Sequence, residues 1–166
     1  MKKKIAIFVT GLLIAVSANA QFEQGKVYAS AGLSSIDLNY KSASKWNLDL
    51  CGKVGYMFKD NWMATADGQW GLHQEEPNYF SLGAGIRYYI EQNGLYLGAG
   101  ARFKHSTGYD DFVPNVQVGY AFFISRTVTI EPELYYDMST KSFSDYSGFG
   151  LRIGFGIYLD KLPDFK

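Results

Sequence analysis

The feature that most constrains the fold is a strict alternation of apolar and polar residues, clearest between residues 45 and 58. One alternate set is Trp46, Leu48, Leu50, Val54, Tyr56 and Phe58, with Gly52 as its one gap. The interleaved set is Asn47, Asp49, Cys51, Lys53, Gly55 and Met57. Successive side chains of a β-strand point to opposite faces, so one face of this segment is apolar and the other carries the charges.

This alternation recurs eight times along the chain. We predict strands at residues 26–38, 45–58, 62–72, 79–90, 95–104, 113–124, 127–138 and 147–159. Bacterial single-chain outer-membrane barrels have even strand numbers and segments of this length and pattern. The predicted fold is therefore all-β, an eight-stranded antiparallel up-and-down transmembrane β-barrel.

The apolar face of the eight segments carries no charged residue. An arginine or lysine on the lipid face of a barrel costs about 2 to 4 kcal/mol at the bilayer midplane, which explains the exclusion. Aromatic residues gather near both ends of the apolar rows, as expected for side chains at headgroup depth. The alternatives are a soluble β-sandwich and a soluble lipocalin-like binder, but the latter needs an apolar cavity and this inner face is charged.

The inner face carries ten charged residues, five of each sign. They are Asp49, Lys53, Asp67, Arg87, Arg102, Lys104, Glu131, Glu133, Asp137 and Arg152. Charges in a low-dielectric interior must pair, and a balanced set can do so. Because eight strands enclose only enough space for side chains, we expect a plugged polar interior. A salt-bridge switch that gates a narrow ion path is the alternative.

The connections between the predicted strands alternate in length. Residues 39–44, 73–78, 105–112 and 139–146 form long connections, and residues 59–61, 91–94 and 125–126 form short ones. Periplasmic turns of outer-membrane barrels are short and external loops are longer, so both chain ends should be periplasmic. We expect external contacts through Tyr109, Phe112, Phe143 and Tyr146, unless these aromatics merely rest on the headgroup layer.

The first twenty residues have the pattern of a secretory signal peptide. Three lysines precede an apolar run at residues 5–16, and Ala18-Asn19-Ala20 gives a small-x-small cleavage motif. Cleavage after Ala20 would leave residues 21–166 as one barrel domain with a short periplasmic tail. Removing those lysines leaves 13 basic residues against 16 acidic ones, without the positive bias of a nucleic-acid binder. Signal and barrel together predict the outer membrane of a Gram-negative cell.

The chain resembles the outer-membrane β-barrel domain family, which includes the small OmpA/OmpX-type barrels. The resemblance rests on the strand pattern and on Gly-Ile-Arg-Tyr-Tyr at residues 85–89 and Glu-Pro-Glu-Leu-Tyr-Tyr at 131–136. The last strand is similar to the family's assembly signal through Arg152, Gly154, Ile157 and Leu159, although the chain continues to Lys166. The resemblance implies outer-membrane lipids, lipopolysaccharide, periplasmic chaperones and the barrel-insertion machinery as partners. The external ligand is left open.

Catalytic and metal-binding patterns are weak. Some barrels that resemble this one modify lipid, which needs a serine, a histidine and a carboxylate together. Here His105 and Ser106 are adjacent and would point to opposite faces, so we expect no enzyme, no cofactor and no metal site. Cys51 is the one cysteine and is interpreted as a packing residue. Pro132 falls inside a predicted strand, where we expect a bulge or a register slip.

Overall fold

The computed structural model describes residues 22–34, 48–72, 79–90, 94–106, 108–141 and 147–160. The described residues form β-strands and their connections, and none of their segments is a helix long and apolar enough to cross a membrane. The strands are β1 (Val27–Ser34), β2 (Leu48–Lys59), β3 (Trp62–Leu72), β4 (Tyr79–Tyr89), β5 (Leu95–Ser106), β6 (Tyr109–Tyr120), β7 (Phe122–Phe123), β8 (Val128–Asp137) and β9 (Gly148–Leu159).

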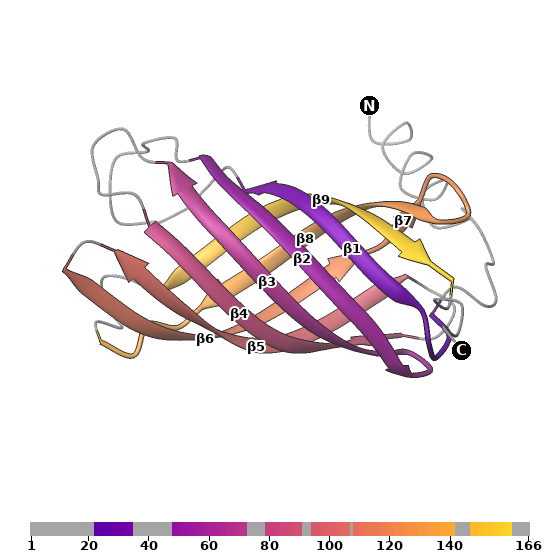
Figure 1. Cartoon of the computed structure of the whole chain (residues 1–166), viewed down its shortest axis with the longest axis horizontal. Coiled ribbons are helices and arrows are strands. Elements are labelled where there is room, and N and C mark those ends of the chain that lie inside the picture. The colour runs from indigo at the N-terminus through magenta and orange to yellow at the C-terminus, as the bar shows by residue number, and fades with distance from the viewer. Residues whose placement is uncertain are drawn as a thin grey trace, which may run out of the picture.

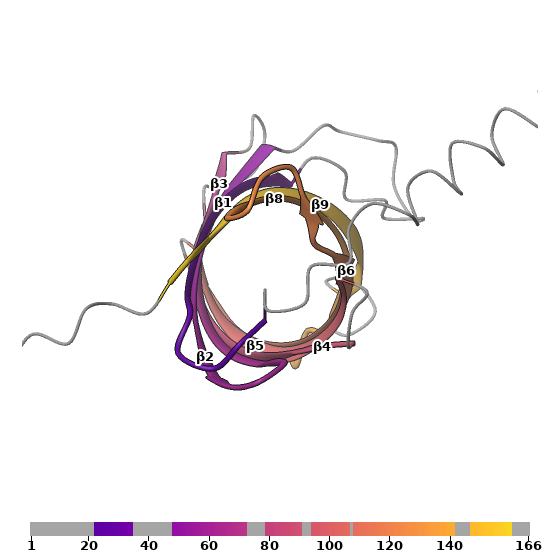
Figure 2. The same ribbon diagram turned by 90° about the vertical axis from the view of Figure 1, so that its right-hand side faces the viewer.

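The strands form one closed antiparallel barrel (Figures 1 and 2). Neighbours in sequence pair from β1 to β6, β8 pairs with β9, and the ring closes through β1–β9 and β6–β8. The two-residue strand β7 continues β6 and pairs with the same partner, β8. The predicted eight-stranded up-and-down barrel is therefore confirmed, with β6 and β7 acting as one interrupted strand.

The interruption between β6 and β7 lies opposite Pro132. Gly119 pairs with Glu133 before the break and Phe122 with Ile130 after it, in one register that places Pro132 opposite Tyr120. On its other side, β8 pairs with β9 in an unbroken register. The expected bulge or slip in β8 is therefore wrong. The proline lacks a backbone N–H, and the ladder is interrupted without an inserted residue.

The third predicted long connection, residues 105–112, is also wrong. β5 continues to Ser106, β6 begins at Tyr109 and these two residues pair, so the connection is a tight hairpin. Gly108 has a positive φ of 81°, which suits a glycine in a turn. Adjacent acidic residues next to a glycine resemble a loop in sequence, but Asp110 and Asp111 alternate between the outer and inner faces of β6.

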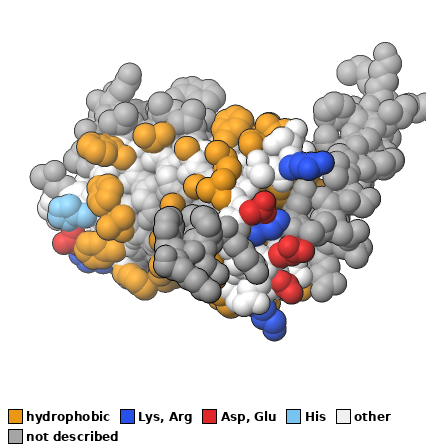
Figure 3. Space-filling view, turned by 45° about the vertical axis from the view of Figure 1, so that its right-hand side comes forward, with side chains coloured by type: hydrophobic (Ala, Val, Ile, Leu, Met, Phe, Trp, Pro, Cys, Tyr) orange, Lys and Arg blue, Asp and Glu red, His pale blue; other side chains and the backbone are white. Residues whose placement is uncertain are grey.

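The barrel wall is apolar outside and polar inside. Leu50, Trp70, Leu82, Phe103 and Phe155 are each more than half exposed. Figure 3 shows such apolar side chains spread over the wall, with charged side chains toward its two ends. This is the reverse of a water-soluble protein and matches a wall that faces hydrocarbon. Every outward residue predicted from the alternation whose side chain is described is exposed or half-buried.

Candidate functional site: the charged interior

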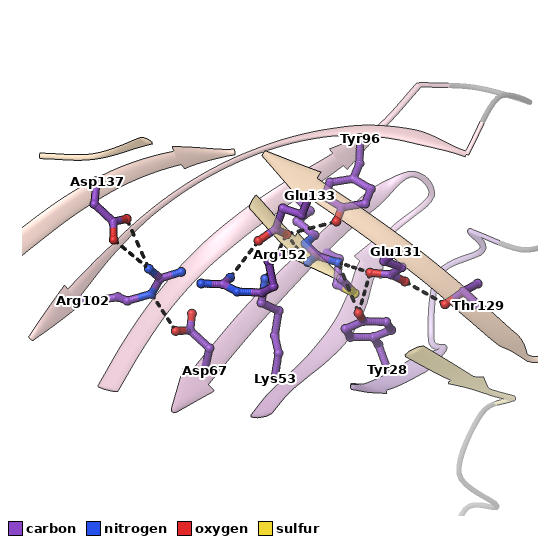
Figure 4. A network of polar contacts seen from close by, with 12 residues as sticks. Tyr28, Lys53, Asp67, Tyr96, Arg102, Thr129, Glu131, Glu133, Asp137 and Arg152 are labelled. Atoms are coloured by element: carbon purple, nitrogen blue, oxygen red, sulfur yellow. Dashed lines mark hydrogen bonds and ion pairs between the residues drawn. The ribbon is translucent and has the colours of Figure 1, made fainter. Parts of the chain in front are cut away.

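Glu133 is the centre of the larger of two ion-pair clusters in the interior (Figure 4). Its Oε2 atom accepts hydrogen bonds from Lys53 Nζ at 3.2 Å, Arg87 Nη2 at 2.7 Å and the Tyr96 hydroxyl at 3.0 Å. Its Oε1 atom accepts from Arg152 Nη1 at 2.8 Å. The carboxylate is 2% exposed and is reached from β2, β4, β5 and β9, so one side chain of β8 joins strands around the barrel.

Glu131 lies two residues along β8 and points into the same interior. Its Oε2 atom accepts from the Tyr28 hydroxyl at 2.6 Å and from Arg87 Nη1 at 3.0 Å. Its Oε1 atom accepts from the Thr129 hydroxyl at 2.9 Å and the Tyr158 hydroxyl at 3.2 Å. Glu131 therefore bonds one cation and three hydroxyl groups, whereas Glu133 bonds three cations and one hydroxyl group.

The second cluster is centred on Arg102 of β5. Its Nε atom donates to Asp67 Oδ2 at 2.9 Å, and its Nη1 atom donates to Asp137 Oδ1 at 3.2 Å. Lys104 Nζ lies 3.8 Å from the ring centroid of Tyr79, within the range of a cation–π interaction. These residues join β3, β4, β5 and β8 and lie toward the β5–β6 hairpin.

The segment before β1 covers the opposite end of the barrel. Phe22 stacks on Tyr89 with ring centroids 4.1 Å apart and lies edge-on to Phe123 and Tyr158, both at 5.7 Å. Asn61 N–H donates to the Phe22 carbonyl at 2.9 Å. Figure 2 views this end and shows the indigo segment crossing the opening. Sequence reasoning missed Phe22, because it precedes the first alternating segment.

The structure places most of the predicted interior charges where the alternation put them. Lys53, Arg87, Arg102, Glu131, Glu133 and Arg152 are buried, and Asp67, Lys104 and Asp137 are partly buried. The Asp49 backbone lies in β2, but its side chain is outside the described ones. Of the residues of the assembly signal, Arg152 and Gly154 face inward and Ile157 and Leu159 face outward.

The structure places two of the predicted external contacts in a strand and not in a loop. Phe112 lies within β6, paired with Phe103 on the outer wall, and Tyr109 is the first residue of that strand. Phe143 and Tyr146 lie outside the described residues. The residue that contacts the last loop is instead Asp111, which is buried and accepts hydrogen bonds from the Ser139 and Thr140 hydroxyls.

The histidine that the structure describes, His105, pairs with a carboxylate. His105 Nδ1 contacts the Asp110 carboxylate across the β5–β6 pair, on the exposed outer face. Ser106 points to the other face of the same strand, as the alternation predicts. His73 lies outside the described residues. Within the described part of the chain, no three His, Cys, Asp or Glu residues are grouped to hold a metal ion.

Comparison with known proteins agrees with the barrel fold. The sequence profile of the outer membrane protein beta-barrel domain family matches residues 6–165. The chain belongs to this family. Three solved structures of similar fold are small outer-membrane barrels, and the chain covers 95% or more of each.

The N-terminal β-barrel domain of Pseudomonas aeruginosa OprF has a TM-score of 0.59 at 14% identity, over 82% of this chain and 98% of that one. Neisserial surface protein A has a TM-score of 0.57 at 17% identity, over 80% and 95%. The Yersinia pestis outer membrane protein Ail has a TM-score of 0.57 at 14% identity, over 82% and 100%. At these identities the likeness establishes the fold. The comparison with curated proteins gave no match.

Proposed function

We propose that this protein is an integral outer-membrane barrel of a Gram-negative cell, with a structural and surface-interaction role and a closed interior. It is exported with a signal peptide that is cleaved after Ala20. Its apolar wall contacts outer-membrane lipids and lipopolysaccharide, and β9 presents the residues that the barrel-insertion machinery recognises. It has no catalytic role, because His105 shares its face of the sheet with no serine in the strands that the structure describes.

The cluster around Glu133 is the observation that most directly supports a closed interior. One carboxylate of β8 accepts hydrogen bonds from three cationic side chains of β2, β4 and β9. An ion that passes through the barrel would have to separate these pairs in a low-dielectric interior. Each buried charge left without its partner would cost several kcal/mol. The Phe22 stack adds an apolar layer between this cluster and the end where β1 begins.

A narrow gated pore is the second candidate, and the same cluster supplies the reason. Glu133 forms ion pairs with three cationic side chains, so one of them could change rotamer and leave the carboxylate paired with the other two. The plug consists of side chains, which change rotamer far faster than a strand moves. In this case the interior would open and close while the barrel stays folded.

Conductance of the purified protein in planar lipid bilayers separates the two candidates. A closed barrel gives no discrete current steps, and the variants Glu131→Gln and Arg102→Ala should also give none as long as they remain folded. A gated pore gives discrete steps in the wild type, and these substitutions change how often it opens. Reproducible steps from the wild-type protein would refute the closed interior.

A further inference from the structure

Arg152 has two buried guanidinium nitrogens without a hydrogen-bond partner. The residue is 4% exposed, and only its Nη1 atom is bonded, to Glu133. Its Nε and Nη2 atoms lack any partner, a condition that the described part of the chain shares only with the hydroxyl of Ser81. Arginine stays protonated in proteins, and an unmet buried donor is costly, so such groups normally mark the place of an unseen partner.

Arg152 borders a small cavity. Its volume is about 10 Å³, and Cys51, Lys53, Gly32 and Gly154 also line it. Gly154 helps to keep it open, because a Cβ atom added there would meet nothing closer than two carbonyl oxygens at 3.9 Å. The cavity has room for about one water-sized particle, so a ligand that fits it is small.

The charge next to the cavity is unbalanced locally, although the inner face as a whole carries five charged residues of each sign. Among the described side chains of this cluster, Lys53, Arg87 and Arg152 carry three positive charges, and Glu131 and Glu133 carry two negative ones. An uncompensated buried charge is strongly unfavourable. A water molecule would accept the free Arg152 hydrogens, but it would leave the excess charge in place.

We propose that the cavity binds one small monovalent anion, such as chloride, held by Arg152 Nε and Nη2 and by Lys53 Nζ. Lys53 has three N–H donors, and the carboxylate of Glu133 takes one of them. The anion would supply the missing negative charge and partners for the free donors at once. Its ligands come from β2 and β9, the two strands that flank β1 at the seam where the barrel closes.

An anion at this seam would make closure of the barrel depend on halide. Binding to the folded state alone shifts the folding equilibrium, and each tenfold rise in chloride above its dissociation constant should raise the folding constant about tenfold. This proposal uses the interior described above but does not depend on whether that interior conducts. Conductance and anion binding are measured separately, so a barrel that conducts and binds an anion can be told from a closed barrel that binds none.

The direct test is crystallography of the full mature protein in sodium bromide, because bromide scatters anomalously and resembles chloride. We expect an anomalous peak within hydrogen-bond distance of Arg152 Nε and Nη2 and of Lys53 Nζ. A cavity that is filled by water or empty, with no peak, would overturn the proposal. This test needs no substitution and is independent of whether a variant folds.

Urea unfolding in detergent micelles provides the solution test. Sodium gluconate, too large for the cavity, is exchanged for sodium chloride at constant ionic strength. We expect chloride to raise the wild-type midpoint, Lys53→Met to abolish the rise, and the exposed control Lys59→Met to keep it. Equal wild-type midpoints in the two salts would overturn the proposal. If, in that case, the urea midpoint of Asp49→Asn rose in chloride, Asp49 would be the group that supplies the negative charge in the wild type.

Discussion

Replacing Glu133 with glutamine tests how the interior is held together. The substitution keeps the shape of the side chain and removes its charge. Three cationic side chains, Lys53, Arg87 and Arg152, then lose their shared carboxylate while they remain buried. Glutamine also has one acceptor oxygen, whereas the carboxylate uses both of its oxygens.

The expected loss of stability follows from this arrangement. Removing one partner of a buried ion pair costs about 3 to 5 kcal/mol, because the remaining charge is left uncompensated. This corresponds to a fall of roughly two to three and a half orders of magnitude in the folding equilibrium constant. Glu131→Gln is the matched comparison: it lies on the same strand and face but bonds one cation, Arg87. It should cost clearly less.

The assay is reversible urea unfolding in lipid vesicles, with folding followed by the gel-mobility difference between unheated and boiled samples. We expect the midpoint of Glu133→Gln to fall well below that of Glu131→Gln, and both to fall below the wild type. If Glu133→Gln is as stable as Glu131→Gln, or more so, then the three cations do not depend on Glu133. The account of the interior would then be refuted.

Two further substitutions test the packing at specific places. Phe22→Ala should destabilise the barrel by about 1 to 3 kcal/mol, because it removes a ring stacked on Tyr89. Glu23→Ala changes an exposed neighbour and should alter the urea midpoint little. Equal effects of the two substitutions would mean that Phe22 does not cap the interior. Gly85→Ala should lower the free energy of unfolding by about 1 to 3 kcal/mol, because its Cβ would lie 2.7 Å from a backbone oxygen of β5. Gly148→Ala, with open space around the added Cβ, should be tolerated. Urea midpoints of both variants test this difference.

The sequence predicted the wall of the barrel well because lipid imposes a simple rule. A charged residue on the lipid face is costly, so the alternation is clean and assigns each residue to a face. The inward position of Glu133 and Arg152 follows from the same alternation. At the β5–β6 hairpin the rule failed, because Asp110 and Asp111 look like a loop although one faces outward to His105 and the other inward to Ser139.

The partners inside the barrel could not be predicted in the same way. Lys53 and Glu133 are 80 residues apart and meet because the strand stagger brings them to one level. Alternation gives the face of a residue but not its height in the barrel. Phe22 could not be found either, since its contacts depend on the path of a segment outside the strands. The unpartnered Arg152 nitrogens are visible only once the packing is known.

We propose that the barrel crosses the outer membrane with the β5–β6 hairpin outside and the β7–β8 turn inside. Cys51 is 3% exposed, so new cysteines can report their position with little background. A membrane-impermeant maleimide should label His105→Cys in intact cells, and Arg126→Cys only after the outer membrane is permeabilised. Labelling of Arg126→Cys alone in intact cells would contradict the orientation, and labelling of both would contradict the membrane-spanning barrel.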